Sequence, residues 1–272
     1  MVTRTSISNT NLTFTSVVSG SNDFSETRST GKNYNRAIFG FGYAVGVNSI
    51  TNLVSVFGNV ATDTSTAGTA RYQLAAAGYG GDKAIFGFGS TYSPTTSLNY
   101  ISLFSNLGVY VSETSGSGTA RYSLAAATYG GDKAIFGFGT SGSVLNTISL
   151  FNNLGAYVSE SSGSGTARSG LGATGYGGDK AIFGFGVITG STLNTISLFN
   201  NLGAYVSESS GSGTARYSLA AATYGGDKAI FGFGSTGGRS NITNLFNNLG
   251  AYVSESSGVG TARYDLAAAS WG

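Results

Sequence analysis

One unit recurs five times along this chain of 272 residues, and no other feature limits its fold so strongly. The motif Ala-Ile-Phe-Gly-Phe-Gly begins at residues 37, 84, 134, 181 and 229, so successive copies lie 47 to 50 residues apart. Residues 118–139 return at 213–234 without one substitution. A repeat of about 40–50 residues is typical of propellers and of helical arrays. The strand signals inside the unit decide between these two architectures.

Each unit reads as four short strands separated by turns. Residues 134–139 alternate, with Ala134, Phe136 and Phe138 on one face and Ile135 and the glycines on the other. Gly-Gly-Asp-Lys before this run and Asn-Asn-Leu-Gly after it have the composition of tight turns. The other apolar runs cover residues 120–129, 146–151 and 156–160. Four antiparallel strands with no room for a helix predict the blades of an all-β propeller.

The two ends of the repeat array predict how the propeller closes. The unit that begins at Gly260 contains only a first strand, in which Trp271 stands where other units have a tyrosine. The motif at Ala37 has no such strand directly before it. We therefore expect residues 262–270 to pair beside residues 37–42 and to close a ring of five blades, which removes the exposed sheet edges. Residues 36–272 then form a five-bladed propeller, and residues 1–35 form an N-terminal arm that lies on it or docks to another protein.

The blade sequence resembles kelch-type repeats. "ARYSLAAATYGGDKAIFGFG" followed by "NTISLFNNLGAYVSE" is similar to a kelch blade, in which an arginine precedes the inner strand and an "IYVFGG"-like strand follows the turn. Here a phenylalanine splits the glycine pair. The kelch tryptophan of the fourth strand is replaced by Tyr110, Tyr157, Tyr205 and Tyr252. The resemblance implies the propeller fold and no particular activity.

Two further resemblances concern the role of the protein. The segment "YGGDKAIFGFG" resembles repeat proteins encoded by tailed bacteriophages, which implies a virion protein. The blade length is similar to that of five-bladed lectins, although their tryptophan-rich sugar motifs are missing from this chain, which has one tryptophan.

Charged residues recur at fixed places in the units and form candidate binding sites. An acid ends each fourth strand, and the arginine of a Gly-Thr-Ala-Arg motif follows eight residues later. Five such pairs, with the tyrosines that follow four of the arginines, could form five equivalent ligand pockets. The alternative is that the pairs are salt bridges between blades and that the tyrosines are buried there. The acids are Asp63, Glu113, Glu160, Glu208 and Glu255, and the ligand-binding candidates are Arg71, Arg121, Arg168, Arg216, Arg263, Tyr72, Tyr122, Tyr217 and Tyr264.

The missing residue types exclude several kinds of chemistry. The chain has no histidine and no cysteine, so imidazole catalysis, thiolate metal sites and disulfides are excluded. No acids cluster as in a calcium loop, and the glycine-rich segments do not open phosphate-binding helices. Five-fold repetition also fits poorly with the two unlike carboxylates of a glycosidase. We expect no catalytic residue, no cofactor and no metal, and thus a protein that is not an enzyme.

The segments that vary between units suggest a role in recognition. They follow the second phenylalanine of the motif, at residues 43–49, 90–100, 140–146, 187–194 and 235–241. Variable loops on a constant scaffold are a common arrangement for binding. The net charge of +2 does not favour nucleic acid as a partner. The first residues contain no apolar run of signal-peptide length, and no stretch reaches the ~18 apolar residues of a membrane span.

These observations, with the bacteriophage resemblance, predict a virion component made in the host cytoplasm. As part of a fibre, a tail or a head decoration, it would attach to protein subunits of the assembly, to the host surface or to surface glycans. One alternative is a free lectin with one weak sugar site per blade. Another is an intracellular interaction module.

Overall fold

The chain is all-β throughout the part that the computed structural model describes. The described residues are 37–43, 46–55, 59–61, 63–64, 68–92, 94–258, 260–268 and 270. They belong to one compact unit, Asn35–Gly272, and form strands and connecting turns without a helix, so the all-β part of the predicted fold class is confirmed. None of them forms a helix of the length and apolar character needed to cross a membrane. The predicted arm, residues 1–35, lies outside the described residues.

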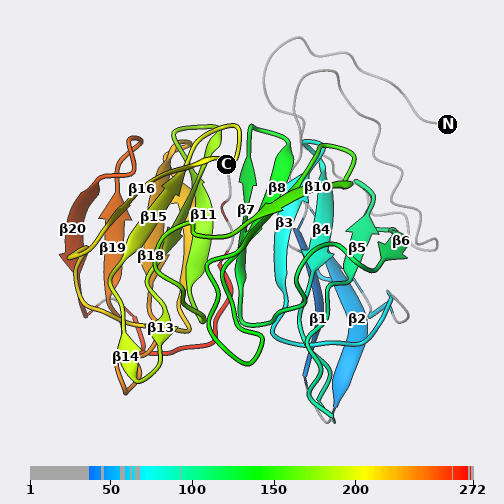
Figure 1. Cartoon of the computed structure of the whole chain (residues 1–272), viewed down its shortest axis with the longest axis horizontal. Coiled ribbons are helices and arrows are strands. Elements are labelled where there is room, and N and C mark those ends of the chain that lie inside the picture. The colour runs from blue at the N-terminus through cyan, green and yellow to red at the C-terminus, as the bar shows by residue number, and fades with distance from the viewer. Residues whose placement is uncertain are drawn as a thin grey trace, which may run out of the picture. The chain divides into compact units, whose positions relative to one another are not determined.

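Four sheets of four antiparallel strands follow one another along the chain (Figure 1). Sheet I contains β3 (Ala75–Tyr79), β4 (Lys83–Gly87), β5 (Ile101–Phe104) and β6 (Tyr110–Thr114). Sheet II contains β7 (Ala125–Tyr129), β8 (Lys133–Gly137), β9 (Ile148–Phe151) and β10 (Tyr157–Ser161). Sheet III contains β11 (Gly172–Tyr176), β12 (Lys180–Gly184), β15 (Ile196–Phe199) and β16 (Tyr205–Ser209). Sheet IV contains β17 (Ala220–Tyr224), β18 (Lys228–Gly232), β19 (Thr243–Phe246) and β20 (Tyr252–Ser256).

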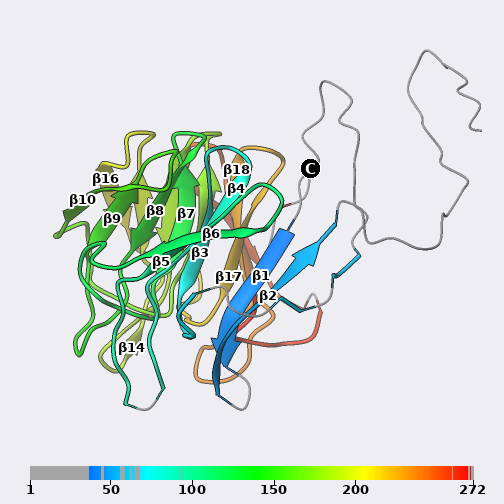
Figure 2. The same ribbon diagram turned by 90° about the vertical axis from the view of Figure 1, so that its right-hand side faces the viewer.

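Two smaller sheets complete the described structure. β1 (Ala37–Tyr43) pairs with β2 (Val47–Val54), and single bridges from Thr64 and Val60 add a further segment beside β2. Figure 2 shows this β1–β2 pair beside sheet I, where Phe41 and Phe86 have ring centres 5.4 Å apart. β13 (Val187–Ile188) and β14 (Ser191–Thr192) form a hairpin inside a variable loop. Four repeated sheets are thus observed, and the number of blades stays a prediction.

The second strand of each unit is shorter than predicted because its last phenylalanine leaves the strand conformation. β8 ends at Gly137, and Phe138 has a φ of 65°, in the left-handed region. The predicted alternation of Ala134, Phe136 and Phe138 is therefore wrong at Phe138. A left-handed phenylalanine costs about 1–2 kcal/mol, so tertiary contacts must hold it in place. The equivalent residues share this conformation with φ of 64–66°: Phe41, Phe88, Phe185 and Phe233.

Neighbouring sheets pack through small residues and phenylalanines. The first strands β3, β7, β11 and β17 contact one another in sequence order, as Figure 1 shows for β3, β7 and β11. Ile135 and Phe136 in β8 point to opposite faces of sheet II, and both are fully buried. Gly137 lies so close to sheet III that a Cβ there would be 3.0 Å from Phe183. The glycine that ends this strand therefore permits the close approach of the two sheets.

Backbone hydrogen bonds join equivalent places at both ends of neighbouring sheets. At one end the Gly130 amide donates to the Asp179 carbonyl at 2.6 Å, turn against turn. At the other end the Gly139 amide donates to the Arg168 carbonyl at 2.9 Å. Sheets II and III therefore have the same orientation. The Gly-Gly-Asp turns lie at one end, which we call the constant end, and the variable loops lie at the other, the variable end.

The C-terminal segment occupies the place of a fifth first strand. The Asp265 amide donates to the Ser218 carbonyl at 3.0 Å, and the Thr223 amide donates to Ser270 Oγ at 2.9 Å. Within the described residues no strand pairing joins residues 260–270 to β1. Closure of the ring therefore stays a prediction, and Trp271 lies outside the described residues.

Candidate functional site

Four of the five predicted arginine ligands lie inside the fold. Arg168 Nη1 donates to the Thr166 carbonyl at 2.9 Å and lies 3.3 Å from a Glu208 carboxylate oxygen, while Nη2 donates to Ser197 Oγ at 2.9 Å. Its guanidinium carbon is 4.1 Å from the ring centre of the left-handed Phe138. The arginine thus joins the strands of sheet III and fastens them to sheet II. The arginines without exposed surface are Arg71, Arg121, Arg168 and Arg216.

The acid partner of each arginine is not the one nearest in sequence. Glu160, eight residues before Arg168, pairs with Arg121 at 3.4 Å, and Arg168 pairs with Glu208. Arg71 and Glu113 form the same pair at 2.8 Å. Both members of each ion pair belong to the same sheet. The expectation that these pairs form salt bridges between blades is therefore wrong. The contact between sheets is the arginine packed on a phenylalanine, an arrangement worth ~2 kcal/mol when desolvated.

Burial and hydrogen bonding act in opposite directions on the carboxylates. Burial raises the pKa of Glu208, but bonds from Thr166 and Ser197 and the charge of Arg168 together lower it below its usual value. Burial lowers the pKa of Arg168 to about 10, which leaves the guanidinium charged at neutral pH. A carboxylate held ionised by so many donors is poorly suited to proton transfer. The pKa is lowered in the same way at Glu113, Glu160 and Glu255.

We call the arginine of each sheet, with the serine and the glutamate that it contacts, the arginine cluster. This cluster differs in sheet IV. Asn244 stands where the other sheets have serine and donates to Glu255 at 2.9 Å. Arg216 turns its Nε to the Phe233 carbonyl at 2.7 Å. The asparagine side chain therefore takes over the hydroxyl's contact with the carboxylate.

Two parts of a further arginine cluster lie near the two ends of the series of repeats. Arg263 is exposed and packs 3.8 Å from the ring centre of Phe233. In the β1–β2 pair, Asn52 donates to Asp63 with the same spacing of eleven residues that separates Asn244 from Glu255. The C-terminal segment thus carries the arginine of such a cluster, and the segment that follows β2 carries its acid.

The tyrosines that follow the arginines lie at the base of the variable loops. Three of these four tyrosines, Tyr264 being the exception, pair their backbone with the first residue of the loop, as Tyr122 does with Thr140. The guanidinium groups of the arginines before Tyr72, Tyr122 and Tyr217 are buried, so arginine and tyrosine have different surroundings in these units. Tyr264 is the most accessible, with 46% of its surface exposed, and Tyr72, Tyr122 and Tyr217 are half-buried. A ligand role for the nine candidates stays a prediction.

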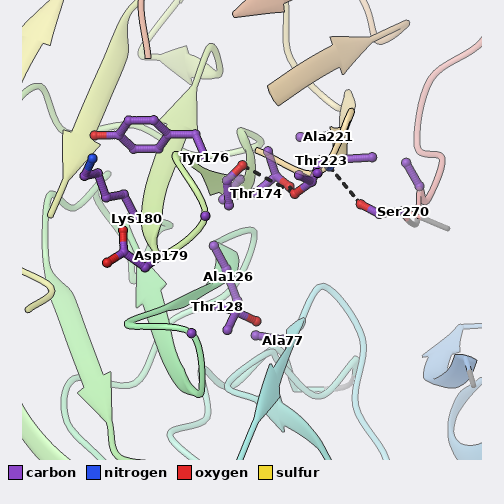
Figure 3. A pocket seen from close by; sticks show the side chains of 18 of the residues that line it. Ala77, Ala126, Thr128, Thr174, Tyr176, Asp179, Lys180, Ala221, Thr223 and Ser270 are labelled. Carbon is purple, nitrogen blue, oxygen red and sulfur yellow. Dashed lines mark hydrogen bonds between the residues drawn. The ribbon is translucent and has the colours of Figure 1, made fainter. Parts of the chain in front are cut away.

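A cavity of about 320 Å³ lies where the first strands converge. Alanine, threonine and glycine residues of β3, β7, β11 and β17 line it, together with Ala268 and Ser270. Figure 3 shows Thr174, Thr223 and Ser270 in one hydrogen-bonded chain, with the two threonine hydroxyls 3.1 Å apart. Asp179 and Lys180 are its charged lining residues. This lining offers weak polar contacts rather than a nucleophile and a base in contact.

A second cavity has a volume of about 250 Å³. Each of the five units contributes the same two consecutive residues to its lining, the second of which is a leucine. From Ser123 onwards, the first residue of the pair in each unit donates a backbone hydrogen bond of 2.8–3.0 Å to the equivalent residue of the preceding unit. The first of these bonds runs from the Ser123 amide to the Gln73 carbonyl. Ser123 has a φ of 52°, and Gly170 takes the same conformation in sheet III. The lining pairs are Gln73–Leu74, Ser123–Leu124, Gly170–Leu171, Ser218–Leu219 and Asp265–Leu266.

Two surface features were not predicted from the sequence. At the variable end the rings of Tyr43, Tyr72 and Tyr92 meet, with centres 4.8–6.3 Å apart. At the constant end the turn before each fourth strand exposes a leucine by 59–75%, at Leu107, Leu154, Leu202 and Leu249. The tyrosine cluster depends on contacts between different segments, so no single stretch of sequence signals it. The leucines recur in the sequence, but a turn motif does not reveal exposure.

Comparison with protein families and with curated proteins finds no match for this chain. The kelch and bacteriophage resemblances therefore stay predictions. Among the described residues, no three histidine, cysteine or acidic side chains gather as they would around a metal ion.

Proposed function

We propose that the five units form a closed propeller of five blades. Equivalent residues of all five units line the second cavity, which supports a common axis. The bond from the Asp265 amide to the Ser218 carbonyl continues the series that links the other units. The C-terminal segment would then serve as the first strand of the blade that contains β1 and β2.

The repeat also supports a register for this closure. In sheet IV, Thr223 pairs with Ala229. Ser270 is the residue equivalent to Thr223, and Ala37 is the residue equivalent to Ala229. Closure would place Ser270 opposite Ala37 and would bring Arg263 to Asp63, so that each half of the incomplete cluster gains its partner.

This propeller would act as a binding module rather than an enzyme, as a component of a virion that attaches to the host surface or to neighbouring subunits. The observation that carries the proposal is that sequence differences between the units collect in loops at one end of otherwise equal sheets. Loops on a rigid framework can vary without loss of the fold. The proposal also relies on the bacteriophage resemblance for the virion itself.

The constant end fits repeated contacts with other subunits. Each turn leucine is exposed, and each Gly-Gly-Asp-Lys turn beside it offers one acid and one base. A symmetric array of identical apolar contacts suits a partner that is itself repeated. A lectin with one arginine-based sugar site per blade is less well supported, because four of the guanidinium groups are buried and already bonded.

Mass spectrometry of purified particles, with a binding assay on host cells, tests the proposal. We expect the protein in the particles. A variant in which residues 90–100, 187–194 and 235–241 are each replaced by the sequence of 140–146 should still assemble but should bind cells weakly. The matched control replaces Leu154, Leu202 and Leu249 by serine, which should spare cell binding and reduce assembly. Absence from every particle, together with unchanged binding after loop replacement, contradicts the proposal.

A further inference from the structure

An exposed cluster of three tyrosines lies where the β1–β2 pair meets sheet I. The ring centres of Tyr43 and Tyr92 are 4.8 Å apart, and Tyr72 lies 5.9 Å from Tyr43 and 6.3 Å from Tyr92. Tyr43 is 48% exposed and Tyr92 is 55% exposed. Three separate segments thus bring their aromatic rings to one accessible patch at the variable end.

Hydrogen bonds hold the backbone around the three tyrosines in place. Tyr43 ends β1 in register with β2, and Tyr72 exchanges backbone hydrogen bonds of 3.1 and 2.9 Å with Ser90. The loop that carries Tyr92 is closed by Thr91, whose hydroxyl donates to the Pro94 carbonyl at 2.7 Å and accepts from the Thr96 amide at 3.2 Å. A surface fixed in this way loses little conformational entropy on binding.

The cluster breaks the five-fold repetition of the chain. The positions equivalent to Tyr43 hold Ser90, Thr140, Val187 and Ser235. A tyrosine equivalent to Tyr72 recurs in other units, but Tyr43 and Tyr92 have no aromatic counterparts there. Tyr43 and Tyr92 thus depart from the repeat, and their rings meet at one place on the surface. This indicates that the two residues serve a purpose other than building the repeated sheets.

The chemistry of the cluster is amphipathic and uncharged. The pKa of Tyr43 is raised above its ordinary value, first by a hydrogen bond with Tyr92, then by burial and by the neighbouring phenols of Tyr92 and Tyr72. A tyrosine ring offers an apolar face and a hydroxyl that donates and accepts. Sugar rings present the matching surface, with C–H groups on one face and hydroxyls at the edge. Three rings are also too few for a stable protein interface, which buries roughly 800 Å² per partner.

We infer that the cluster of Tyr43, Tyr72 and Tyr92 binds a neutral saccharide, with the sugar packed on the aromatic rings and hydrogen-bonded to the phenol oxygens. The inference rests on the proposed recognition role of the variable end and narrows it to one site and one class of ligand. It differs from a lectin with one site per blade, because the site uses residues that the other units lack.

The test is a titration of the full chain, labelled on its tyrosine rings, with neutral mono- and disaccharides built from glucose, galactose, mannose and N-acetylglucosamine, followed by NMR. We expect saturable shifts of the signals of Tyr43, Tyr72 and Tyr92. Tyr43→Ala and Tyr92→Ala should each weaken binding about tenfold, as loss of a central aromatic contact does. The matched control is Tyr157→Phe, at a tyrosine of β10 that is 41% exposed and is not part of the cluster, and it should leave affinity unchanged. Tyr43→Phe, which keeps the ring, should retain part of the affinity.

The outcomes separate this inference from the proposed function. If no saccharide shifts these signals while loop replacement still abolishes cell binding, the inference is overturned and the recognition role stands. If both assays are negative, both fail. Shifts that persist in the two alanine variants place the sugar elsewhere and overturn the site. A protein partner that binds this cluster in place of sugars overturns the class of ligand. Unchanged thermal unfolding of the half-exposed tyrosine variants confirms that they are folded.

Discussion

At the residue scale, each buried arginine combines contacts that no other side chain could supply together. In sheets I to III its planar fork bonds a carbonyl, a serine and a glutamate of its own sheet, while its flat face covers a phenylalanine that precedes that sheet in the chain. The ring reaches this place only because its residue takes a left-handed backbone conformation. The arginine and the strained phenylalanine are thus two parts of one joint between sheets.

Replacing Arg168 by alanine should destabilise the protein by about 3–5 kcal/mol, because the buried guanidinium is lost from Phe138 and Ser197 and the half-buried Glu208 is left without its cation. Urea unfolding measures the loss. Arg168→Lys should restore little of it, since an ammonium group cannot make the same fork of bonds. The control is Arg239→Ala, an exposed arginine, which should change stability by less than about 0.5 kcal/mol. Equal effects of the two alanine variants would show that the cluster contributes nothing.

Ser123 offers a stabilising substitution that the chain itself suggests. Its φ of 52° is unfavourable for any residue with a Cβ, and the equivalent Gly170 has a φ of 61°. Ser123→Gly should therefore stabilise the protein by about 0.5–1 kcal/mol in thermal or urea unfolding. The reverse change, Gly170→Ser, should cost a similar amount. A destabilising effect of Ser123→Gly would mean that the serine side chain makes a contact that outweighs the backbone strain.

At the scale of elements, the four strands of each unit could be predicted because glycine-rich turns bound short apolar runs. The end of the second strand could not, because β8 and Phe138 read as one alternating segment. The partner of each arginine was also missed. Sequence proximity favoured Glu160 for Arg168, whereas the fold returns Glu208 to it from the last strand of the same sheet. Such pairings depend on contacts 40 residues apart, which local patterns do not encode.

The carboxylates of these sheets predict how stability depends on pH. The pKa of Glu160 is lowered in the folded protein, so the stability that it contributes is complete above its unfolded pKa of about 4.3. That contribution is lost as the pH falls through the lower, folded pKa. We expect the melting temperature to fall below about pH 5, and Glu160→Gln to be less stable at pH 7 and less sensitive to acid. A variant with the wild-type pH profile would contradict this assignment.

At the scale of the whole molecule, the proposed ring would explain why one half of an arginine–acid cluster lies at each end of the array. In sheets I to III the arginine and the acid of a cluster lie side by side. Among the described residues, Arg263 is exposed and Asp63 is bonded to Asn52, and the two do not pair with each other. In a closed ring, Arg263→Ala should cost stability comparable to Arg168→Ala, about 3–5 kcal/mol. In an open array it should behave like the surface change Arg239→Ala. Urea unfolding of the three variants decides between these cases.

The most direct test of the closed five-bladed ring is a disulfide across the predicted closure. The chain has no cysteine, so Ala37→Cys with Ser270→Cys introduces the only pair. Directly opposed residues in an antiparallel sheet have Cα atoms about 4.5–5.5 Å apart, within the range of a disulfide. The control pair, Phe39→Cys with Ser270→Cys, is two residues out of register, where the separation of about 7–8 Å is too long. After mild oxidation of the native protein, mass spectrometry should find a peptide that joins residues 37 and 270, and little product from the control. Free thiols in the first pair, or equal oxidation of both pairs, would contradict the closed ring.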